Sequence, residues 1–191
     1  MKKTTFLFSL LISLLLMSSI VHSAETSALG DNNFTVKVDY INFFDKNNGD
    51  SFYIGFEGYK ELAGNVYVGV EAGYVGTDGN LETFETDLDS DLIFIPIELN
   101  VKYTIKATSK FIIDLGTGIS CSYAKEDVPK LYTSDTIDDW VVGGQLFADL
   151  NYKIGQLFLG FNGKVQLTDK GKDSANSYSN WRIGGQIGVM F

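Results

Sequence analysis

Cysteine, histidine and proline are scarce in this 191-residue sequence, and no long apolar run follows its first 23 residues. The only cysteine, Cys121, has no partner for an intramolecular disulfide. Two prolines, alongside many Val, Ile, Tyr, Phe and Thr residues, favour strands over helices. Because the mature chain lacks a run that could cross a bilayer as a helix, it could span a membrane only as a β-barrel.

The amino-terminal segment has the features of a secretory signal peptide. Lys2 and Lys3 precede an apolar run from Phe6 to Ile20, and Val21 and Ser23 place an aliphatic and a small residue third and first before the expected cleavage site. We expect cleavage between Ser23 and Ala24, so residues 1–23 form the signal peptide and residues 24–191 the mature domain. Export would follow the Sec pathway into the periplasm. A retained membrane anchor is the alternative, which the short apolar core disfavours.

Basic residues are few in the mature chain. Without Lys2 and Lys3, the 15 basic residues fall to 13 against 24 acidic residues, which gives a net charge of -11. Nucleic-acid partners require basic patches, so this balance argues against them.

Strict alternation of apolar and polar or small residues recurs eight times along the chain. From Val66 to Tyr74, for example, every second residue is apolar, which is the period of a strand. The predicted strands are Phe34 to Phe44, Phe52 to Lys60, Val66 to Val75, Leu92 to Ile105, Lys110 to Tyr123, Trp140 to Lys153, Gln156 to Thr168 and Asn180 to Phe191.

The connections between these strands alternate in length. Three are short, at Glu61 to Asn65, Ala107 to Ser109 and Ile154-Gly155, and the others are longer. Short turns at one end and long loops at the other are typical of outer-membrane barrels. The pattern predicts an all-β fold: an eight-stranded antiparallel up-and-down transmembrane β-barrel with both chain ends on the periplasmic side.

Charged residues occupy only one face of the predicted strands. The face expected to point outward is nearly free of charge and includes Ile93, Ile95, Ile97, Leu99, Val101, Phe111, Ile113, Leu115, Ile119, Leu157, Leu159, Phe161 and Val165. The face expected to point inward carries Lys37, Asp39, Glu57, Glu71, Glu98, Lys102, Asp114, Asp149, Lys164 and Arg182. We expect cross-strand ion pairs there, such as Lys102 with Asp114, and two surplus acids.

A soluble barrel would reverse these faces, and alternation alone does not distinguish the two arrangements. Aromatic residues at both ends of the outward face favour the membrane form, in which they mark the two interfaces. Those at the long-loop end are Phe52, Tyr74, Tyr123, Trp140 and Trp181, and those at the short-turn end are Phe34, Tyr103, Phe111, Tyr152 and Phe191.

The last predicted strand alternates from Trp181 to Phe191. This strand resembles the terminal assembly signal of outer-membrane barrels, in which a final aromatic residue is read by the insertion machinery. The resemblance implies that the outer-membrane assembly machinery is a partner and that Phe191 contributes to recognition.

Two segments carry a wider resemblance. The sequence Ile95-Pro96-Ile97-Glu98-Leu99-Asn100-Val101-Lys102-Tyr103, followed by Leu115-Gly116-Thr117-Gly118, is similar to the bacterial outer-membrane β-barrel domain family, the porin-like small barrels of OmpA and OmpX type. The resemblance covers the mature chain and marks architecture rather than activity. It implies a Gram-negative outer membrane, contact with its lipid and lipopolysaccharide, and roles in adhesion, serum resistance or envelope integrity.

Catalytic and cofactor-binding residues are not apparent. The only histidine, His22, lies in the expected signal peptide, so the mature chain has no imidazole to activate a serine or water. Glu57 and Glu71 form a carboxylate pair on adjacent predicted strands, but such pairs in a lumen with Lys and Arg usually belong to structural charge networks. We therefore expect no enzyme activity, catalytic residue, cofactor or metal ligand.

Two acidic segments invite comparison with calcium sites. Asp45 to Asp50 has glycine where a calcium loop needs a ligand and lacks its final glutamate, so we interpret it as a hairpin turn. The second long loop carries several acids without a Lys or Arg between them, and either a solvated tip or a divalent-cation site shared with lipopolysaccharide phosphates explains it. These acids are Asp78, Glu82, Glu85, Asp87, Asp89 and Asp91.

Pro96 conflicts with the simple barrel. It lies in mid-strand on the inward face, and a closed barrel offers no free edge, so we expect a bulge to accommodate its missing N–H.

The sequence favours a structural or surface-interaction protein, with a role in adhesion or envelope integrity, whose long loops project from a closed barrel. The interior of an eight-stranded barrel is only wide enough for side chains to fill it. Bulky residues predicted to fill it are Tyr53, Tyr67, Phe94, Phe147 and Phe158, offset by Gly69, Gly116, Gly143, Gly160 and Gly184. A narrow ion or small-solute pore and a lipid-modifying enzyme are the alternatives. The extracellular partner stays open.

Overall fold

The structure, a computed structural model, describes residues 27–45, 48–83, 86–129, 134–172 and 177–191. The predicted signal peptide and its cleavage site lie outside these residues. Among the described residues, no helix is long and apolar enough to cross a membrane.

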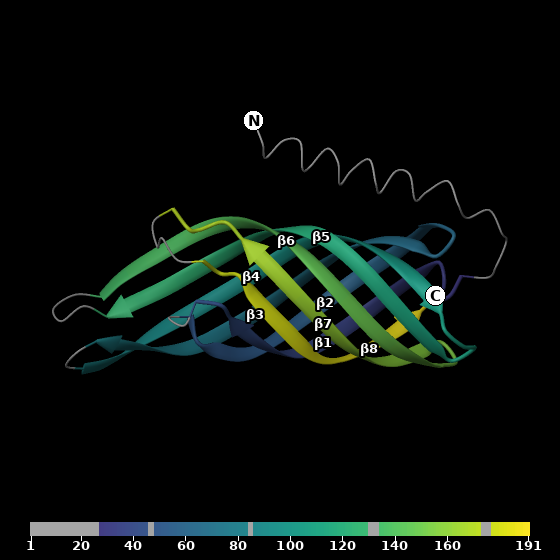
Figure 1. The fold of residues 1–191 in the computed structure, drawn as a ribbon, viewed down its shortest axis with the longest axis horizontal. Coiled ribbons are helices and arrows are strands. Elements are labelled where there is room, and N and C mark those ends of the chain that lie inside the picture. The colour runs from purple at the N-terminus through teal and green to yellow at the C-terminus, as the bar shows by residue number, and fades with distance from the viewer. Residues whose placement is uncertain (1–26, 46–47, 84–85, 130–133, 173–176) are drawn as a thin grey trace, which may run out of the picture.

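Antiparallel strands form one closed sheet in which each strand pairs with its neighbours in sequence and the last pairs with the first (Figure 1). The strands are β1 (Asn32–Phe43), β2 (Asp50–Ala63), β3 (Val66–Thr83), β4 (Thr86–Lys106), β5 (Phe111–Pro129), β6 (Ser134–Ile154), β7 (Leu157–Thr168) and β8 (Asn180–Met190). The predicted eight-stranded antiparallel barrel is therefore confirmed.

Tight turns join the strands at the end of the barrel where the carboxyl terminus lies (Figure 1). Between β2 and β3 the turn consists of Gly64 and Asn65, with φ angles of 53° and 66°. Both residues are left-handed, as a two-residue hairpin with the twist of its strands requires, and Gly and Asn adopt this conformation most easily. The turn between β6 and β7 begins at Gly155, which has a φ angle of 65°. The predicted short connections are confirmed, and we call this the turn end.

At the opposite end, the loop end, the hairpins extend further than the sequence predicted (Figure 1). Strands β3 and β4 remain paired up to Thr83 and Thr86, so most of the predicted second long loop is a two-stranded ribbon. Likewise, β5 and β6 remain paired up to Pro129 and Ser134. The alternation of apolar residues fades in these acidic segments, but backbone pairing does not require it, which is why the predicted strands ended too early.

The two faces of the sheet are those predicted. Every one of the ten charged residues predicted to point inward is buried, at no more than 5% exposed. Outward-facing residues such as Ile97, Leu115 and Ile119 are about half exposed. The barrel therefore buries its charges and exposes its apolar side chains, the reverse of a soluble barrel.

Aromatic side chains gather at both ends of the exposed face. At the loop end, the rings of Tyr123 and Trp140 lie 5.5 Å apart, and those of Tyr40 and Trp181 lie 5.6 Å apart. At the turn end, Phe111 and Tyr152 pair at 5.1 Å, and the exposed residues Phe34, Tyr103 and Phe191 join them. The two predicted groups of aromatic residues are therefore present at the two ends of the exposed face. The exposed apolar side chains between them form what we call the apolar belt, and the aromatic groups border it as membrane interfaces would.

Pro96 is accommodated without the bulge that the sequence led us to expect. The β3–β4 pairing breaks between Ala72–Ile97 and Val75–Phe94, then resumes in the same register. Pro96 falls opposite Gly73 in this gap, where the ring of Tyr53 lies so close that a Cβ on Gly73 would clash with it. A local interruption of the ladder therefore absorbs the missing N–H, and the faces stay in phase.

The outward face can be tested by placing a charge at two depths. Leu115 lies within the apolar belt and Leu62 next to the turn end, and both are exposed. An Arg side chain facing lipid near the middle of the membrane lowers the free energy of unfolding by about 2 to 4 kcal/mol, and one near an interface lowers it by about 0 to 1 kcal/mol. We expect Leu115→Arg to lower the unfolding free energy in lipid vesicles well below that of Leu62→Arg. Equal losses for the two variants would show that this surface does not face lipid.

Candidate functional site

The centre of the lumen holds two carboxylates that share two cations. Lys164 donates from Nζ to Glu71 Oε2 at 2.6 Å and also to Glu98. Arg182 donates to Glu98, and its Nη1 lies 3.6 Å from Glu71 Oε1. Tyr53 adds a hydrogen bond from its hydroxyl to Glu71 Oε1 at 2.6 Å. These groups come from five strands, β2, β3, β4, β7 and β8, so the ion pairs tie opposite walls of the barrel together.

Two further lysines continue this network. Lys37 Nζ lies 2.8 Å from Glu57 Oε2 and 3.6 Å from Glu71 Oε2. Glu57 and Glu71 are cross-strand neighbours, so Lys37 compensates both members of the carboxylate pair found in the sequence. Lys102 donates to Asp114 at 3.1 Å, which confirms the predicted pair. We call these residues, with Glu98, Lys164 and Arg182, the central charge network.

Aromatic rings also contact the buried cations. The guanidinium of Arg182 lies 4.2 Å from the centre of the Tyr53 ring, and the ammonium of Lys102 lies 4.0 Å from that of Tyr59. Such contacts are stronger where water is excluded, and they help to offset the cost of burying the charges.

Two acids of the lumen form no salt bridge with any residue that the structure describes. Asp39 accepts a hydrogen bond from Asn162 Nδ2 at 2.9 Å but forms no salt bridge with a described residue. Both carboxylate oxygens of Asp149 lack a hydrogen-bond partner among the described residues. These are the two surplus acids that the count of six acids and four bases predicted.

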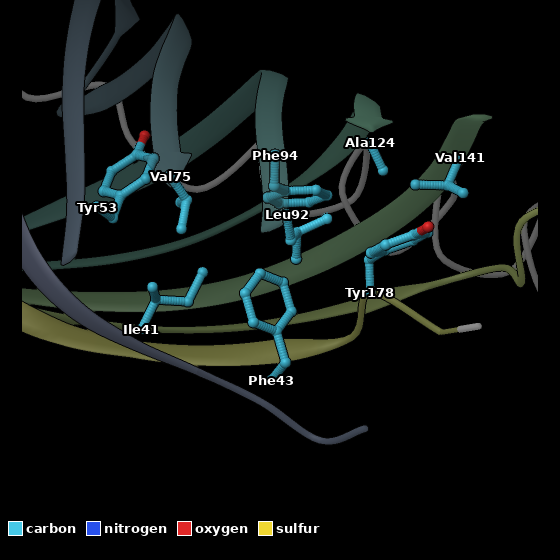
Figure 2. Packing of buried hydrophobic residues seen from close by; sticks show 9 residues of the cluster. All are labelled: Ile41, Phe43, Tyr53, Val75, Leu92, Phe94, Ala124, Val141 and Tyr178. Carbon is cyan, nitrogen blue, oxygen red and sulfur yellow. The ribbon is translucent and has the colours of Figure 1, made fainter. Parts of the chain in front are cut away.

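An apolar cluster lies inside the lumen toward the loop end (Figure 2). The rings of Phe43 and Phe94 meet edge to face at 5.5 Å, and Tyr178 stacks on Phe94 at 5.9 Å. The hydroxyl of Tyr178 donates to Glu126 Oε1 at 2.7 Å. We call this group the loop-end cluster; its members are Ile41, Phe43, Tyr53, Val75, Leu92, Phe94, Ala124, Val141 and Tyr178.

A second apolar cluster lies inside the lumen toward the turn end. Leu29, which precedes β1, is fully buried in it. Its backbone N–H donates to the hydroxyl of Tyr67 at 3.1 Å, and that hydroxyl donates to the carbonyl of Gly30 at 3.0 Å. We call this group the turn-end cluster; its members are Leu29, Tyr59, Tyr67, Ile112, Phe147, Phe158 and Met190.

The central charge network lies between the two clusters. Along β2, Glu57 stands between Tyr53 and Tyr59, which belong to the loop-end and turn-end clusters respectively. Large and small inward residues interlock, as predicted: the five bulky residues are buried, and the Phe147 ring occupies the space that a Cβ on Gly116 would need. The interior thus has a charged centre with an apolar cluster toward each end, and buried polar side chains such as Asn33, Gln166 and Asn180 lie beside those clusters.

Sequence reasoning missed two of the residues that seal the lumen, Leu29 and Tyr178. Both lie outside the strands, where no alternation identifies an inward position. A weak signal was present, since each is a large apolar or aromatic residue within an otherwise polar or small-residue connection.

Among the described residues, no group of three or more His, Cys, Asp or Glu side chains could hold a metal ion. In the Asp45 to Asp50 segment, the N–H of Asn48 donates to the carbonyl of Asp45 at 3.1 Å, as in a turn. Five of the predicted loop acids, Asp78, Glu82, Asp87, Asp89 and Asp91, fall on the extended β3–β4 ribbon, and Glu85 lies outside the described residues.

The solved structures similar to this chain include small barrels of bacterial outer membranes. Neisserial surface protein A matches with a TM-score of 0.55 at 11% identity, over 84% of this chain and 96% of its own. The outer membrane protein OprG of Pseudomonas aeruginosa matches with a TM-score of 0.55 at 12% identity, over 86% of this chain and 98% of its own. Ail, the attachment invasion locus protein of Yersinia pestis, matches with a TM-score of 0.52 at 10% identity, over 84% of this chain and 99% of its own.

The chain has the fold of the small outer-membrane β-barrels. At these identities the likeness is one of fold. No protein-family model and no curated protein matches the sequence. The resemblance inferred from the sequence is confirmed at this level, and the function of this outer-membrane-type barrel must be argued from its own residues.

The central charge network can be tested with a double-mutant cycle on Arg182 and Glu98. Removing one partner of a buried ion pair typically costs about 3 to 5 kcal/mol, because the other charge stays buried. We expect Arg182→Ala and Glu98→Ala each to lower the unfolding free energy in lipid by about that amount. We expect the double variant to lose much less than the sum. Additive losses, measured by denaturant titration, would contradict a direct pair.

Proposed function

We propose that the protein is an integral outer-membrane barrel with a closed lumen, which supports hairpins that contact partners outside the cell. Export through the Sec pathway brings it to the periplasm, and outer-membrane lipid and lipopolysaccharide surround its apolar belt. The observation that carries this proposal is the layered interior. The paired charge network and the two apolar clusters fill the interior with side chains that are almost fully buried, which supports a lumen closed to ions and solutes.

The projecting hairpins support the surface role. Strand β2 pairs with β3 only as far as Val75, whereas β3 and β4 stay paired to Thr83. This ribbon extends about 26 Å beyond Val75, at roughly 3.3 Å per residue. Strand β6 likewise pairs with β7 only from Gly143 onward, although it begins at Ser134. The rigid barrel would hold both ribbons clear of the membrane surface.

The chemistry of the lumen supports a structural role for its charges. Glu71 and Glu98 are each engaged by Lys164 and Arg182, and Asp114 by Lys102 and Thr104. Carboxylates held this way stabilise the barrel rather than transfer protons to a substrate. Lipid A from cells with and without the protein would have the same mass spectrum, whereas a changed acylation pattern would favour the enzyme.

Conductance tests the closed lumen directly. We expect wild-type protein to produce negligible current in planar bilayers after it has inserted. Insertion is checked in parallel by the mobility shift that folded barrels show on heating. Steady single-channel currents from the inserted protein would overturn the closed lumen and favour the narrow pore.

Shortening a ribbon tests the surface role. Thr77 and Leu92 are cross-strand partners, so an Asn-Gly turn can replace residues 78–91 between them. We expect this variant to fold normally and to remain closed, while bacteria that display it attach less to epithelial cells than bacteria with the wild type. Equal attachment at equal surface levels would contradict this role of the β3–β4 ribbon without contradicting the proposed barrel.

A further inference from the structure

A groove crosses the apolar belt near the turn end of β1, β2 and β3. The sheet register aligns one row of outward residues across four strands: Phe34, Gly58, Val70 and Leu99. Phe34, Val70 and Leu99 are exposed and project from the wall, whereas Gly58 between them has no side chain. A Cβ built on Gly58 would meet nothing within 4 Å. The result is a groove of about 460 Å³ whose floor is the backbone of β2.

A lysine stands at the turn end of this groove. Lys60 lies two residues beyond Gly58 on β2, faces outward and is exposed. It forms no salt bridge with a described residue. The nearby carboxylate of Glu61 is directed to the turn, where it accepts a hydrogen bond from the N–H of Asn65 at 2.8 Å. The ammonium of Lys60 therefore faces the boundary between the apolar belt and the periplasmic side, where Phe191 also lines the groove.

A second groove of the same size repeats this design on the other side of the barrel. It is lined by outward residues of β6, β7 and β8 that include Leu150, Phe161 and Gly185. The ammonium of Lys110 lies 5.9 Å from the ring centre of Tyr152, which lines the turn end of that groove. Both grooves thus combine an apolar surface with a lysine toward the turn end.

We propose that the groove over Gly58 binds a glycerophospholipid of the periplasmic leaflet, with an acyl chain along Gly58 and its phosphodiester at Lys60. This inference rests on the proposed membrane-spanning barrel. Charge complementarity selects the occupant, because the ammonium matches a phosphodiester and the apolar walls match a hydrocarbon chain. The turn end selects the leaflet, because it is the periplasmic side of the proposed barrel.

Native mass spectrometry of the folded barrel, released from detergent micelles, tests this site with two probes. One probe is dioleoyl-phosphatidylglycerol, and the other is dioleoylglycerol, which has the same chains without the phosphate. Gly58→Leu fills the groove and should weaken retention of both lipids by about fivefold to tenfold. Lys60→Gln should weaken only phosphatidylglycerol, to the level of dioleoylglycerol.

Matched controls separate the groove from general effects. Gly144→Leu adds the same side chain at an outward glycine that lines neither groove, and Lys106→Gln removes a lysine elsewhere at the turn end. Both should retain lipid as the wild type does. The smaller Gly58→Ala provides a second groove variant, and the heat-induced mobility shift confirms folding of each protein.

Each contrary outcome has a distinct meaning. Equal lipid retention by wild type, Gly58→Leu, Gly58→Ala and Lys60→Gln would overturn the site while leaving the membrane barrel intact. Loss of a dimer in Gly58→Leu, without loss of lipid, would also overturn it and make the groove an interface between copies. Failure of the wild type to insert into bilayers would instead contradict the proposed function itself.

Discussion

Glu71 and Glu98 share Lys164 and Arg182 at the centre of the barrel, and the rest of the structure depends on this arrangement. Charges can be buried in a low-dielectric interior only when they are paired, and these pairs require side chains from several strands to meet at one level. That requirement favours a single register around the barrel. Because side chains alternate, the same register turns the apolar residues outward to form the belt.

The two apolar clusters give the buried charges their surroundings. Aromatic and aliphatic side chains above and below the central charge network exclude water, which strengthens each ion pair and raises the cost of breaking it. We therefore interpret the lumen as a core rather than as a channel. In the proposed function, a core of this kind makes the barrel a rigid support for the ribbons at the loop end.

Much of this fold could be predicted from the sequence. Alternation with a period of two indicates both where a strand lies and which of its residues face the lumen. It placed Lys102 beside Asp114 and predicted two surplus acids, found as Asp39 and Asp149. Alternation carries no information outside strands, so it missed Leu29 and Tyr178, which close the two ends. It also ended β3 and β4 too early, since an acidic ribbon is held by backbone pairing alone. We expected a bulge at Pro96. The sequence does not show that the β3–β4 pairing can be interrupted for two residue pairs and then resume in the same register.

The central claim is that the charge network is sealed from bulk water on both sides. Nuclear magnetic resonance of the wild-type protein in lipid nanodiscs can measure proton exchange with water at the guanidinium of Arg182 and the ammonium of Lys164. The account predicts resolved side-chain signals whose exchange is far slower than that of the exposed Lys60. Exchange of Arg182 and Lys164 as fast as that of Lys60 would show a water-filled lumen and contradict the account.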